Sequence, residues 1–315
     1  MSSVILEGLS LSKNFGDVIA LDDLSIEVLR GEAFGLLGPN GAGKTTAINI
    51  LVGLLKPDSG KVFLDGKSIR DGDKRVLDNV GVCPQQITLW GRLSCIEQLI
   101  FIGNLYGMTR IKARDRGKAL LQTFGLEDKK NKLAKTLSGG MQRRLNLAMA
   151  LVHDPAILIL DEPEAGLDPQ SRVLVREYLK SLAGEKTIIL TSHNMDEVDR
   201  MADRVAIIDQ GKVLVLDTPE KLKASVGTGD VVEIKINHER QDLSRLLRTL
   251  KDFEDTLQYD ILGDEIFVRG FRIIQYLPDL ISLLKSEEII PESINLRENT
   301  LEDVFIQFTG RRLRE

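Results

Sequence analysis

Hydrophobic and polar residues alternate along the first part of the chain as half-buried strands require. Residues 4–15 and 20–29 both show this alternation, which predicts two antiparallel strands with one face on the core. Residues 32–38 form a more continuous apolar run that ends in glycine, as in a buried strand that leads into a loop. Helical periodicity at 45–55 and a short strand pattern at 61–66 follow.

The middle of the chain changes repeatedly between helical and strand patterns. Residues 92–135 are mainly helical in pattern. The elements expected after them are helices at 141–154, 170–183 and 195–202 and strands at 156–163, 187–193 and 204–209. This alternation predicts an α/β fold with a parallel sheet covered by helices on both faces.

The pattern changes at the small, glycine-containing stretch 224–230. We therefore expect a first domain at 1–224 and a second at 225–315. The second is expected to contain strands at 231–236, 255–262, 265–269 and 289–296, helices at 242–252, 272–286 and 300–309, and a hairpin turn at 263–264. The order βαββαβ predicts a small α+β domain of the split-βαβ type.

Composition limits the classes of function. The net charge is -5 and the pI about 5.5, whereas nucleic-acid-binding proteins are commonly basic, so we expect no nucleic-acid partner. The N-terminus lacks a signal-peptide pattern, and apolar runs such as 156–160 are far shorter than the roughly 20 residues of a membrane span. Cys83 and Cys95 form no CxxC pair and lie near no histidine cluster, so no zinc site is expected.

The sequence GPNGAGKTT fits the phosphate-binding loop pattern, and it stands between a predicted strand and a predicted helix. Its glycines let the backbone N–H groups approach phosphate oxygens, and the following helix directs its positive end at the same anions. Lys44 is expected to reach the β- and γ-phosphates of ATP, and Thr45 to hold Mg²⁺. The expected nucleotide-binding residues are Gly38, Pro39, Asn40, Gly41, Ala42, Gly43, Lys44, Thr45 and Thr46.

A second motif, LILDEP, ends a buried apolar strand with two adjacent carboxylates. Asp161 at the strand end suits Mg²⁺ binding. Glu162 suits a general base that orients the attacking water. Solvated acids at a strand end are common in isolation, but the phosphate loop upstream favours the catalytic interpretation.

A third motif, LSGGMQRR, lies upstream of LILDEP. Ser138 is a good N-cap, and Gly139 and Gly140 expose backbone N–H groups at a helix start. This predicts a second anion site, which one chain cannot readily fold onto the nucleotide of its own phosphate loop. LSGGMQRR resembles the signature of ABC ATPases.

The resemblance implies an ABC nucleotide-binding domain with a mixed sheet core, an antiparallel β subdomain and a helical subdomain at about 86–150. It further implies that each ATP lies between the phosphate loop of one subunit and the signature of another, with Ser138, Gly139 and Gly140 on the nucleotide. The partners so implied are a second ATPase subunit, in a homodimer or a heterodimer, and a permease in a separate membrane chain. The chain itself would then be cytoplasmic and peripheral on the inner face of the cell membrane.

Smaller elements agree with the family in order and spacing. PQQ at 84–86 is similar to the Q-loop, which implies contact of Gln85 with Mg²⁺ or the attacking water. AGLDP at 165–169 is similar to the D-loop, with Asp168 reaching across the dimer. LTSHNMDEV at 190–198 is similar to the H-loop, with His193 on the γ-phosphate. The family places an aromatic ring at Phe15 to stack on adenine, although a core phenylalanine near a strand end is also credible.

Two positions depart from the family, which often has Ser or Thr at Glu164 and Tyr at Cys83. The extra carboxylate of Glu164 is expected either to raise a neighbouring pKa or to point to solvent. Near the C-terminus, TLEDVF at 300–305 is similar to the tail of daunorubicin-resistance-type ATPases, the separate subunits of type-2 multidrug exporters. Thr300 there also fits a simple helix N-cap.

Three functions remain in view. The resemblance favours a subunit that powers export of drugs, lipids or other hydrophobic compounds. The alternatives are a non-transport ABC ATPase acting on ribosomes or DNA, and a regulatory module whose C-terminal domain binds a small ligand. A basic segment at 110–135 is expected either to face an anionic membrane or to form a solvated helix face.

Overall fold

The computed structural model describes residues 3–69, 78–192, 194–227, 229–236, 257–262, 265–286, 289 and 291–310. Contacts within the chain divide it into two compact units, Met1–Thr218 and Pro219–Glu315. The second unit begins with α8 (Pro219–Ser225) because this helix packs on α11 (Leu301–Thr309) near the end of the chain. The domain boundary at 224/225 stays a prediction.

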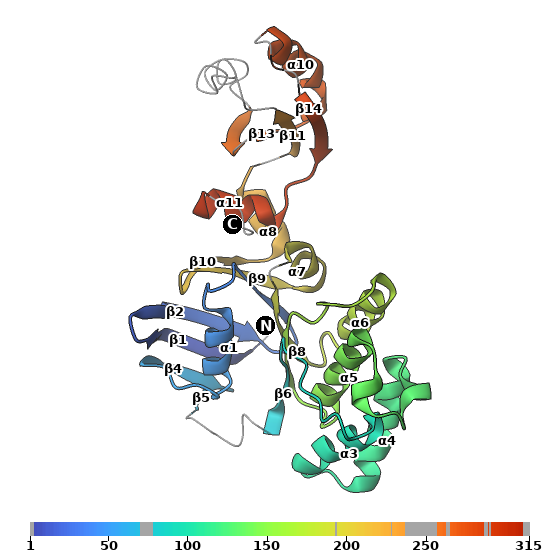
Figure 1. Cartoon of the computed structure of the whole chain (residues 1–315). Helices are drawn as coiled ribbons and strands as arrows, with labels where there is room; N and C mark the ends of the chain where they lie inside the picture. Colours follow the sequence, from blue (N-terminus) through green and yellow to red (C-terminus); the bar gives the residue numbers. More distant parts are fainter. Residues whose placement is uncertain are drawn as a thin grey trace. The chain divides into compact units, whose positions relative to one another are not determined.

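The first unit contains an antiparallel sheet in the order β2-β1-β4-β5. Its strands are β1 (Val4–Phe15), β2 (Val18–Leu29), β4 (Ser59–Leu64) and β5 (Lys67–Ser68). The alternation in β1 and β2 places residues such as Leu11, Leu24 and Ile26 in the core, where they pack with Ile48 of α1 (Lys44–Leu51). Figure 1 shows α1 beside this sheet.

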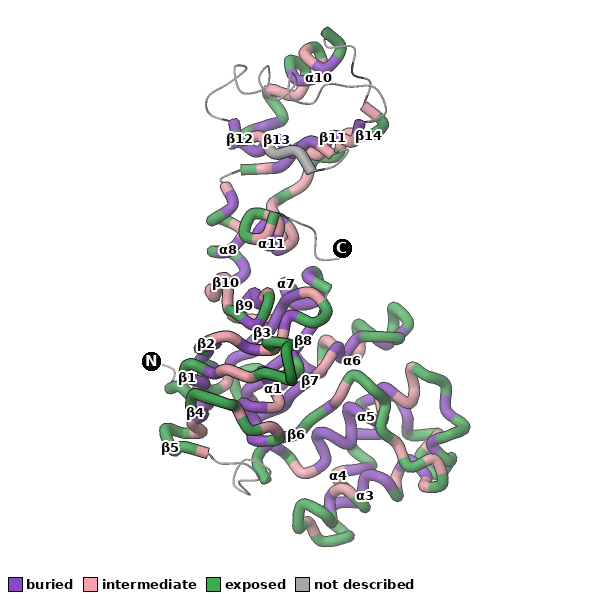
Figure 2. Tube along the Cα trace, turned by 60° about the vertical axis from the view of Figure 1, so that its left-hand side comes forward, coloured by how far each residue is buried: buried purple, intermediate pink, exposed green. Residues whose placement is uncertain are grey.

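A six-stranded sheet carries the centre of the unit, in the order β10-β9-β3-β8-β7-β6. The strands are β3 (Ala33–Leu37), β6 (Val80–Cys83), β7 (Ile157–Asp161), β8 (Thr187–Ser192), β9 (Arg204–Asp209) and β10 (Lys212–Asp217). β10 pairs antiparallel with β9, and the other five strands are mutually parallel, so the expected mixed sheet is confirmed. Figure 2 shows buried residues along β3, β7, β8 and β9, whereas the edge strand β10 has none.

Strand register brings three functional segments to one edge of this sheet. Leu37 of β3 is level with Ser192 of β8, and Thr191 of β8 is level with Asp161 of β7. Since parallel strands end at the same edge, the segments that follow β3, β7 and β8 emerge side by side. The phosphate loop, Glu162 and the H-loop therefore begin next to one another.

The helical subdomain is built on three helices, α3 (Cys95–Leu105), α4 (Arg110–Thr123) and α5 (Gly139–Leu151). Ser94 starts α3 with a capping box to Glu97. Gly103 lets α3 and α4 approach closely, because a Cβ there would lie 2.6 Å from the Cβ of Ala113. Short 3₁₀ turns at Glu127–Lys129 and Ala134–Thr136 lead into α5, which contacts β6 (Figure 1).

Two further helices follow, α6 (Pro169–Ser181) and α7 (Met195–Met201), and α7 packs on β3 and β8. Their N-caps are Asp168 and Asn194, whose side chains accept hydrogen bonds from backbone N–H groups of the first turn. The sequence pattern did not predict β5, β6, β10 and α8, which are only two to seven residues long.

The second unit contains an antiparallel sheet in the order β12-β13-β11-β14. Its strands are β11 (Asp230–Ile236), β12 (Gln258–Leu262), β13 (Glu265–Gly270) and β14 (Pro291–Arg297). A 3₁₀ turn (Ile273–Gln275) and α10 (Leu277–Ser286) take the place of the single helix predicted at 272–286. The predicted helix at 242–252 and turn at 263–264 lie outside the described residues.

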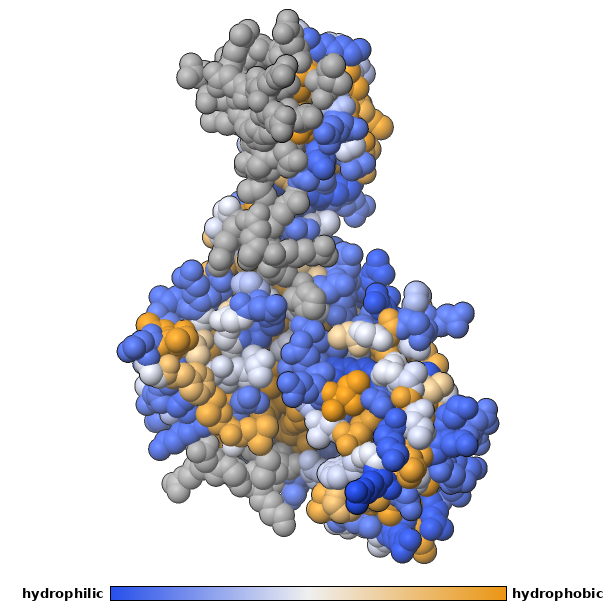
Figure 3. Space-filling view, viewed as in Figure 1, coloured by the Kyte–Doolittle hydropathy of each residue, from blue (hydrophilic) through white to orange (hydrophobic). Residues whose placement is uncertain are grey.

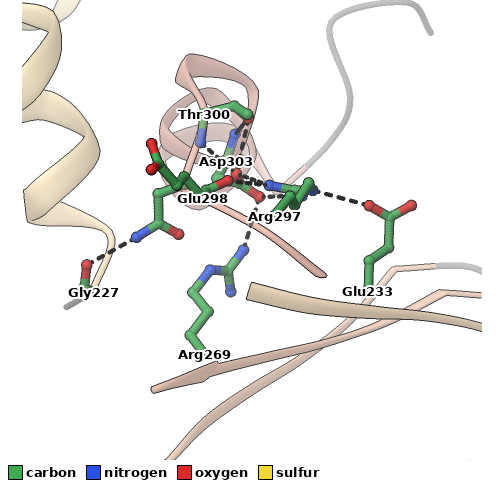
Figure 4. Close-up of polar contacts among 8 residues, drawn as sticks. Gly227, Glu233, Arg269, Arg297, Glu298, Thr300 and Asp303 are labelled. Carbon is green, nitrogen blue, oxygen red and sulfur yellow. Dashed lines mark hydrogen bonds and ion pairs between the residues drawn. The ribbon is translucent and has the colours of Figure 1, made fainter. Parts of the chain in front are cut away.

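A buried ion cluster attaches α11 to the sheet of the second unit (Figure 4). Asp303 is 1% exposed, and its carboxylate accepts hydrogen bonds from Arg269 at 3.1 Å and from both terminal nitrogens of Arg297 at 2.6 and 3.0 Å. It also completes a capping box with Thr300, which confirms the expected N-cap. Arg297 reaches on to Glu233 of β11 at 3.0 Å.

Candidate active site

The phosphate loop connects β3 to α1. Gly43 adopts φ +103°, and a Cβ there would lie 2.4 Å from the carbonyl oxygen of Ala20, so no other residue fits without a shift of the backbone. Lys44 is buried, and its Nζ donates to the carbonyl oxygens of Gly38 at 2.6 Å and Pro39 at 2.9 Å. Burial lowers the pKa of Lys44, and the carboxylates of Glu162 and Asp161 oppose that shift.

The remaining loop residues connect the end of β3 to the first turn of α1. Asn40 and Gly41 are exposed, and Gly41 takes φ +82°. Thr45 and Thr46 stand in the first turn of α1, where Thr45 is exposed. The backbone N–H of Ala42 turns back to Pro39 at 3.2 Å.

The carboxyl end of β7 carries two carboxylates with different environments. Asp161 accepts a hydrogen bond at Oδ1 from the hydroxyl of Thr191 on the neighbouring strand β8. Glu162 is buried and has φ +51°, in the left-handed region, which costs a residue with a side chain on the order of 1–3 kcal/mol. Its N–H donates to the carbonyl of Thr191 at 3.0 Å.

Gln85 and Glu162 are in direct contact. The amide Nε2 of Gln85 donates to Oε2 of Glu162 at 3.0 Å. Gln85 follows β6 and Glu162 follows β7, and these strands are neighbours in the sheet. The structure thus joins the predicted base to the predicted Q-loop residue, although the two are far apart in sequence.

The signature segment starts α5. Ser138 is its N-cap and accepts a hydrogen bond from the N–H of Met141 at 3.4 Å. A Cβ at Gly139 would meet no atom within 4 Å, so this helix terminus is open. α5 packs with α3 and α4, whereas α1 packs with β1 and β2, so the phosphate loop and the signature begin helices of different subdomains.

The other predicted site residues are placed as follows. Asp168 caps α6, and both carboxylate oxygens accept from Ser171, at 3.0 and 2.7 Å. The hydroxyl and N–H of Ser171 lower the pKa of Asp168. Phe15 is 50% exposed at the end of β1, so it is no core residue and that alternative was wrong. His193 lies outside the described residues.

Glu164 does not point to solvent, and that alternative was wrong too. Glu164 is buried and forms a bidentate pair with Arg176 of α6, at 2.8 and 2.7 Å. Its charge acts on Glu197, whose pKa is raised to about 7 by burial first and then by the carboxylates of Glu164 and Glu162. The hydroxyl of Ser192 donates to Glu197 at 2.7 Å and partly opposes the shift.

Cys83, the second departure, is a core residue. Its thiol is fully buried and accepts a hydrogen bond from Asn146 at 3.3 Å. Burial raises the pKa of Cys83 to about 11, so the group stays a neutral thiol at physiological pH. It lies on the strand that leads to Gln85 and fills space there.

Sequence reasoning missed Thr191, Glu197 and Arg143 as parts of the site. Thr191 lies two residues before the predicted H-loop histidine in the sequence, and Arg143 lies inside the predicted signature. Their positions near known motifs were a signal, but their contacts cross from one strand or helix to another. A one-dimensional pattern does not contain such contacts.

Comparison with known proteins agrees with this geometry. Residues 21–165 match the family model described as ABC transporter. The linearmycin resistance ATP-binding protein LnrL of Bacillus subtilis is 34% identical over 99% of this chain and all of its own length. The Nod factor export ATP-binding protein I of Cupriavidus pinatubonensis is 38% identical, covering 99% of this chain and 93% of the relative. The daunorubicin resistance ATP-binding protein DrrA3 of Streptomyces coeruleorubidus is 36% identical, with 96% of both chains covered.

Solved structures agree as well. The cassette MJ0796, in a dimeric post-hydrolysis state with ADP and Pi, superposes with a TM-score of 0.63 at 26% identity, over 68% of this chain and 98% of that chain. CbiO1 of Clostridium perfringens, part of the transporter complex CbiONQ, superposes with a TM-score of 0.64 at 31% identity, over 70% of this chain and 91% of that chain.

The fold and the site define a P-loop ATPase with an ABC cassette. The chain belongs to the ABC transporter family. It is an ATP-binding and ATP-hydrolysing subunit of the exporter type that its resistance and export relatives represent. ATPase subunits of this family dimerise and work with a permease. None of the helices in the described part of the chain has both the length and the apolar character that crossing a bilayer demands.

Proposed function

We propose that this chain drives export of a hydrophobic compound, such as a drug or a lipid, by ATP-dependent closure of a dimer coupled to a separate permease. The observation that carries the proposal is the convergence of the phosphate loop, Asp161 and the Gln85–Glu162 pair at one edge of the sheet. The relatives named for linearmycin resistance, daunorubicin resistance and Nod factor export support the cargo class and the direction.

Each of the predicted site residues has a role in this proposal. The loop N–H groups and Lys44 bind the phosphates of ATP, and Phe15, exposed and without a core role, stacks on adenine. Glu162 takes the proton of the attacking water, and the contact with Gln85 holds the carboxylate in place. His193 donates to the γ-phosphate.

The same edge offers a set of oxygen donors that fits Mg²⁺. Asp161 supplies a carboxylate, Thr45 an exposed hydroxyl and Gln85 an amide oxygen, all hard ligands of the kind Mg²⁺ prefers. The Thr191 hydroxyl on Oδ1 orients the Asp161 carboxylate for this purpose. When bound, Mg²⁺ neutralises charge on the β- and γ-phosphates.

The separation of the two anion sites supports a composite site between subunits. Ser138, Gly139 and Gly140 form an open helix terminus on α5, away from the helix that follows the phosphate loop. In the proposed dimer this terminus binds the ATP held by the partner's phosphate loop, and Asp168 lies at the same interface. Both halves are present in this chain, so a homodimer has two working sites, and a heterodimer with a related subunit is compatible too.

The helical subdomain offers a surface for the permease. Apolar side chains gather over it in Figure 3. Trp90, Phe101, Leu105 and Tyr106 are 39–65% exposed, and the rings of Trp90 and Phe101 meet edge to face at 5.0 Å. Exposed apolar clusters of this kind mark protein contacts. The cluster follows Gln85 in sequence, so movement of the Gln85–Glu162 pair has a short path to the permease.

The proposed location is cytoplasmic, peripheral on the inner face of the cell membrane and held there by the permease. The basic segment 110–135 is mostly exposed, which suits an anionic surface or a solvated face alike. If neutralising those charges leaves membrane association unchanged, the proposed membrane role of this segment is refuted.

The experiment that tests the function is purification of tagged Glu162→Gln chain from its native membranes with ATP, followed by mass spectrometry. A polytopic membrane protein in about equal amount is the expected partner. The Gly139→Asp chain is the matched control, because it is expected to fold but not to close on ATP. Recovery of ribosomal or DNA-bound proteins without a membrane partner would overturn the transport proposal in favour of the non-transport class.

A further inference from the structure

Arg143 is a buried arginine on the signature helix, one turn after Gly139. Its side chain is 2% exposed. The guanidinium donates only to main-chain carbonyl oxygens in its hydrogen bonds here, and these carbonyls belong to two separate loops. They are Pro84 at 2.5 Å and Gln85 at 3.2 Å in the Q-loop, and Asp161 at the end of β7 with Glu162 at 2.6 Å and Pro163 at 3.4 Å directly after it.

These bonds hold both members of the Gln85–Glu162 pair by their backbones. Arg143 donates to the carbonyl oxygen of Gln85, and it also donates to the three consecutive carbonyl oxygens of residues 161–163. Glu162 keeps an unfavourable positive φ, and such a conformation persists only where its surroundings determine it. Arg143 is a large part of those surroundings.

The chemistry requires an arginine. A planar guanidinium presents five N–H donors in fixed directions, so one side chain can bridge two loops at once. A lysine ammonium is a compact point charge on a flexible stem and lacks that geometry. Without the guanidinium, these main-chain carbonyls would lose hydrogen-bond partners in a buried region, which costs free energy.

We propose that Arg143 is a positioning residue through which the signature helix of a subunit sets the Gln85–Glu162 pair of that same subunit. The inference rests on the proposed function, since it assumes that Glu162 is the base and that sites are composite. Arg143 touches no substrate in this proposal. It acts on the rate through the geometry of the base and not through ATP binding.

Steady-state kinetics of the full-length homodimer give the first test. Arg143→Met keeps the aliphatic stem and removes the donors. We expect kcat to fall about 10- to 100-fold, because small displacements of a catalytic group are that costly. KM for ATP is expected to change less than about twofold. Arg204→Met is the matched control: it removes an arginine of the same unit that bonds Glu32 instead, and the rate should persist.

Arg143→Lys guards against a variant that fails to fold. It keeps the charge and most of the volume, and we expect a normal melting temperature with a clear loss of kcat, smaller than that of Arg143→Met. An unchanged rate in Arg143→Lys, or a rise of KM with kcat intact in either variant, would overturn the proposal.

Mixed dimers, isolated with two different affinity tags, test whether the effect stays within one subunit. A dimer of one Gly139→Asp subunit with a wild-type partner has a single working site and sets the reference rate. When Arg143→Met is added to the Gly139→Asp subunit, the working site uses that subunit's own Glu162. We expect this dimer to lose activity.

The reverse combination places Arg143→Met in one subunit and Gly139→Asp in its partner. The working site then uses the Glu162 of the Gly139→Asp subunit and only the signature of the Arg143→Met subunit, so the reference rate is expected. Equal losses in both arrangements, or loss only in the reverse one, would mean that Arg143 merely supports the signature. A Gly139→Asp homodimer with wild-type activity would instead refute the composite site, and so the proposed function itself.

Discussion

The side-chain amide of Gln85 donates a 3.0 Å hydrogen bond to Oε2 of Glu162. The two residues follow adjacent parallel strands, in which Cys83 is level with Leu160. Gln85 is exposed and Glu162 is buried, so the bond runs from the surface of the protein to the proposed base. A movement of the Q-loop therefore alters the position of the carboxylate directly.

Glu162→Gln is expected to abolish turnover while ATP binding persists. An amide cannot accept the proton of the attacking water, and loss of a general base costs about 10²- to 10⁴-fold in kcat. The variant should accumulate as a closed dimer with ATP. Phosphate release and size-exclusion chromatography measure the two effects. Glu185→Gln, on an exposed loop, is the control and should behave as wild type. Wild-type turnover in Glu162→Gln would refute the assignment of the base.

Mixing two inactive chains is expected to restore activity. Lys44→Ala removes a cation from the phosphate loop. Gly139→Asp puts a negative charge where an ATP phosphate should bind, in open space at a helix start that tolerates an acid. In a mixed dimer one site carries both defects and the other neither. We expect the mixture to hydrolyse ATP and each homodimer to be inactive. An inactive mixture of well-folded chains would argue against a site shared between subunits.

Glu197→Gln is expected to stabilise the first unit at alkaline pH. Folding raises the pKa of Glu197 from 4.5 to about 7, so the folded state binds the proton more tightly than the unfolded state. The stability from this group is complete below pH 4.5 and is lost as the pH rises through about 7. The loss is on the order of 3 kcal/mol, and glutamine does not suffer it.

Urea unfolding at pH 5 and pH 8 measures this effect. The gain in the free energy of unfolding from Glu197→Gln should appear at pH 8 and be small at pH 5. Glu185→Gln provides the comparison for simple loss of a charge. The same gain at both values of pH would show that the ionisation of Glu197 is not the cause.

Asp303→Asn is expected to loosen the second unit. The change leaves Arg269 and Arg297 buried or half-buried against a neutral amide, and breaking a buried ion cluster costs about 3–5 kcal/mol. Hydrogen exchange over 230–236 and 301–309 should report faster opening. Glu302→Gln, one residue away in the same helical turn, is the control and should leave exchange nearly unchanged.

The pH dependence of the same cluster has the opposite sign to that of Glu197. Burial raises the pKa of Asp303, but hydrogen bonds from Arg297 and Thr300 outweigh it and hold the pKa at about 2. The contribution of Asp303 is therefore complete above the ordinary value of 3.8 and is lost as the pH falls toward about 2. Wild type and Asp303→Asn should converge in stability under strongly acidic conditions and differ at neutral pH.

The sequence predicted the fold best where a motif determines the backbone geometry of the residues next to it. The glycines of the phosphate loop, the apolar run before Asp161 and the N-cap at Ser138 each act within a few residues. The geometry of each motif therefore depends on residues close to it in sequence, and these motifs identified the class of protein. The alternating pattern likewise predicted most strands and helices, since burial of one face depends on residue spacing.

The environment of each site residue depended on the tertiary structure. Sequence alone left Phe15 and Glu164 with two interpretations each, and the structure shows an exposed ring and a buried carboxylate paired with Arg176. Exposure and pairing depend on which elements pack nearby. The local sequence pattern says little about which elements pack near a given residue.

By itself, the sequence determined the chemistry available to this protein: a phosphate loop, a pair of carboxylates and a second anion-binding helix start. Only the tertiary structure decided that Gln85 bonds Glu162 and that Arg143 binds both of their backbones. Strand order in the six-stranded sheet produces these contacts by placing β6 beside β7, with α5 packed against β6. That order arises from the packing of the whole unit, because the free energy of a sheet depends on contacts between strands that are distant in sequence.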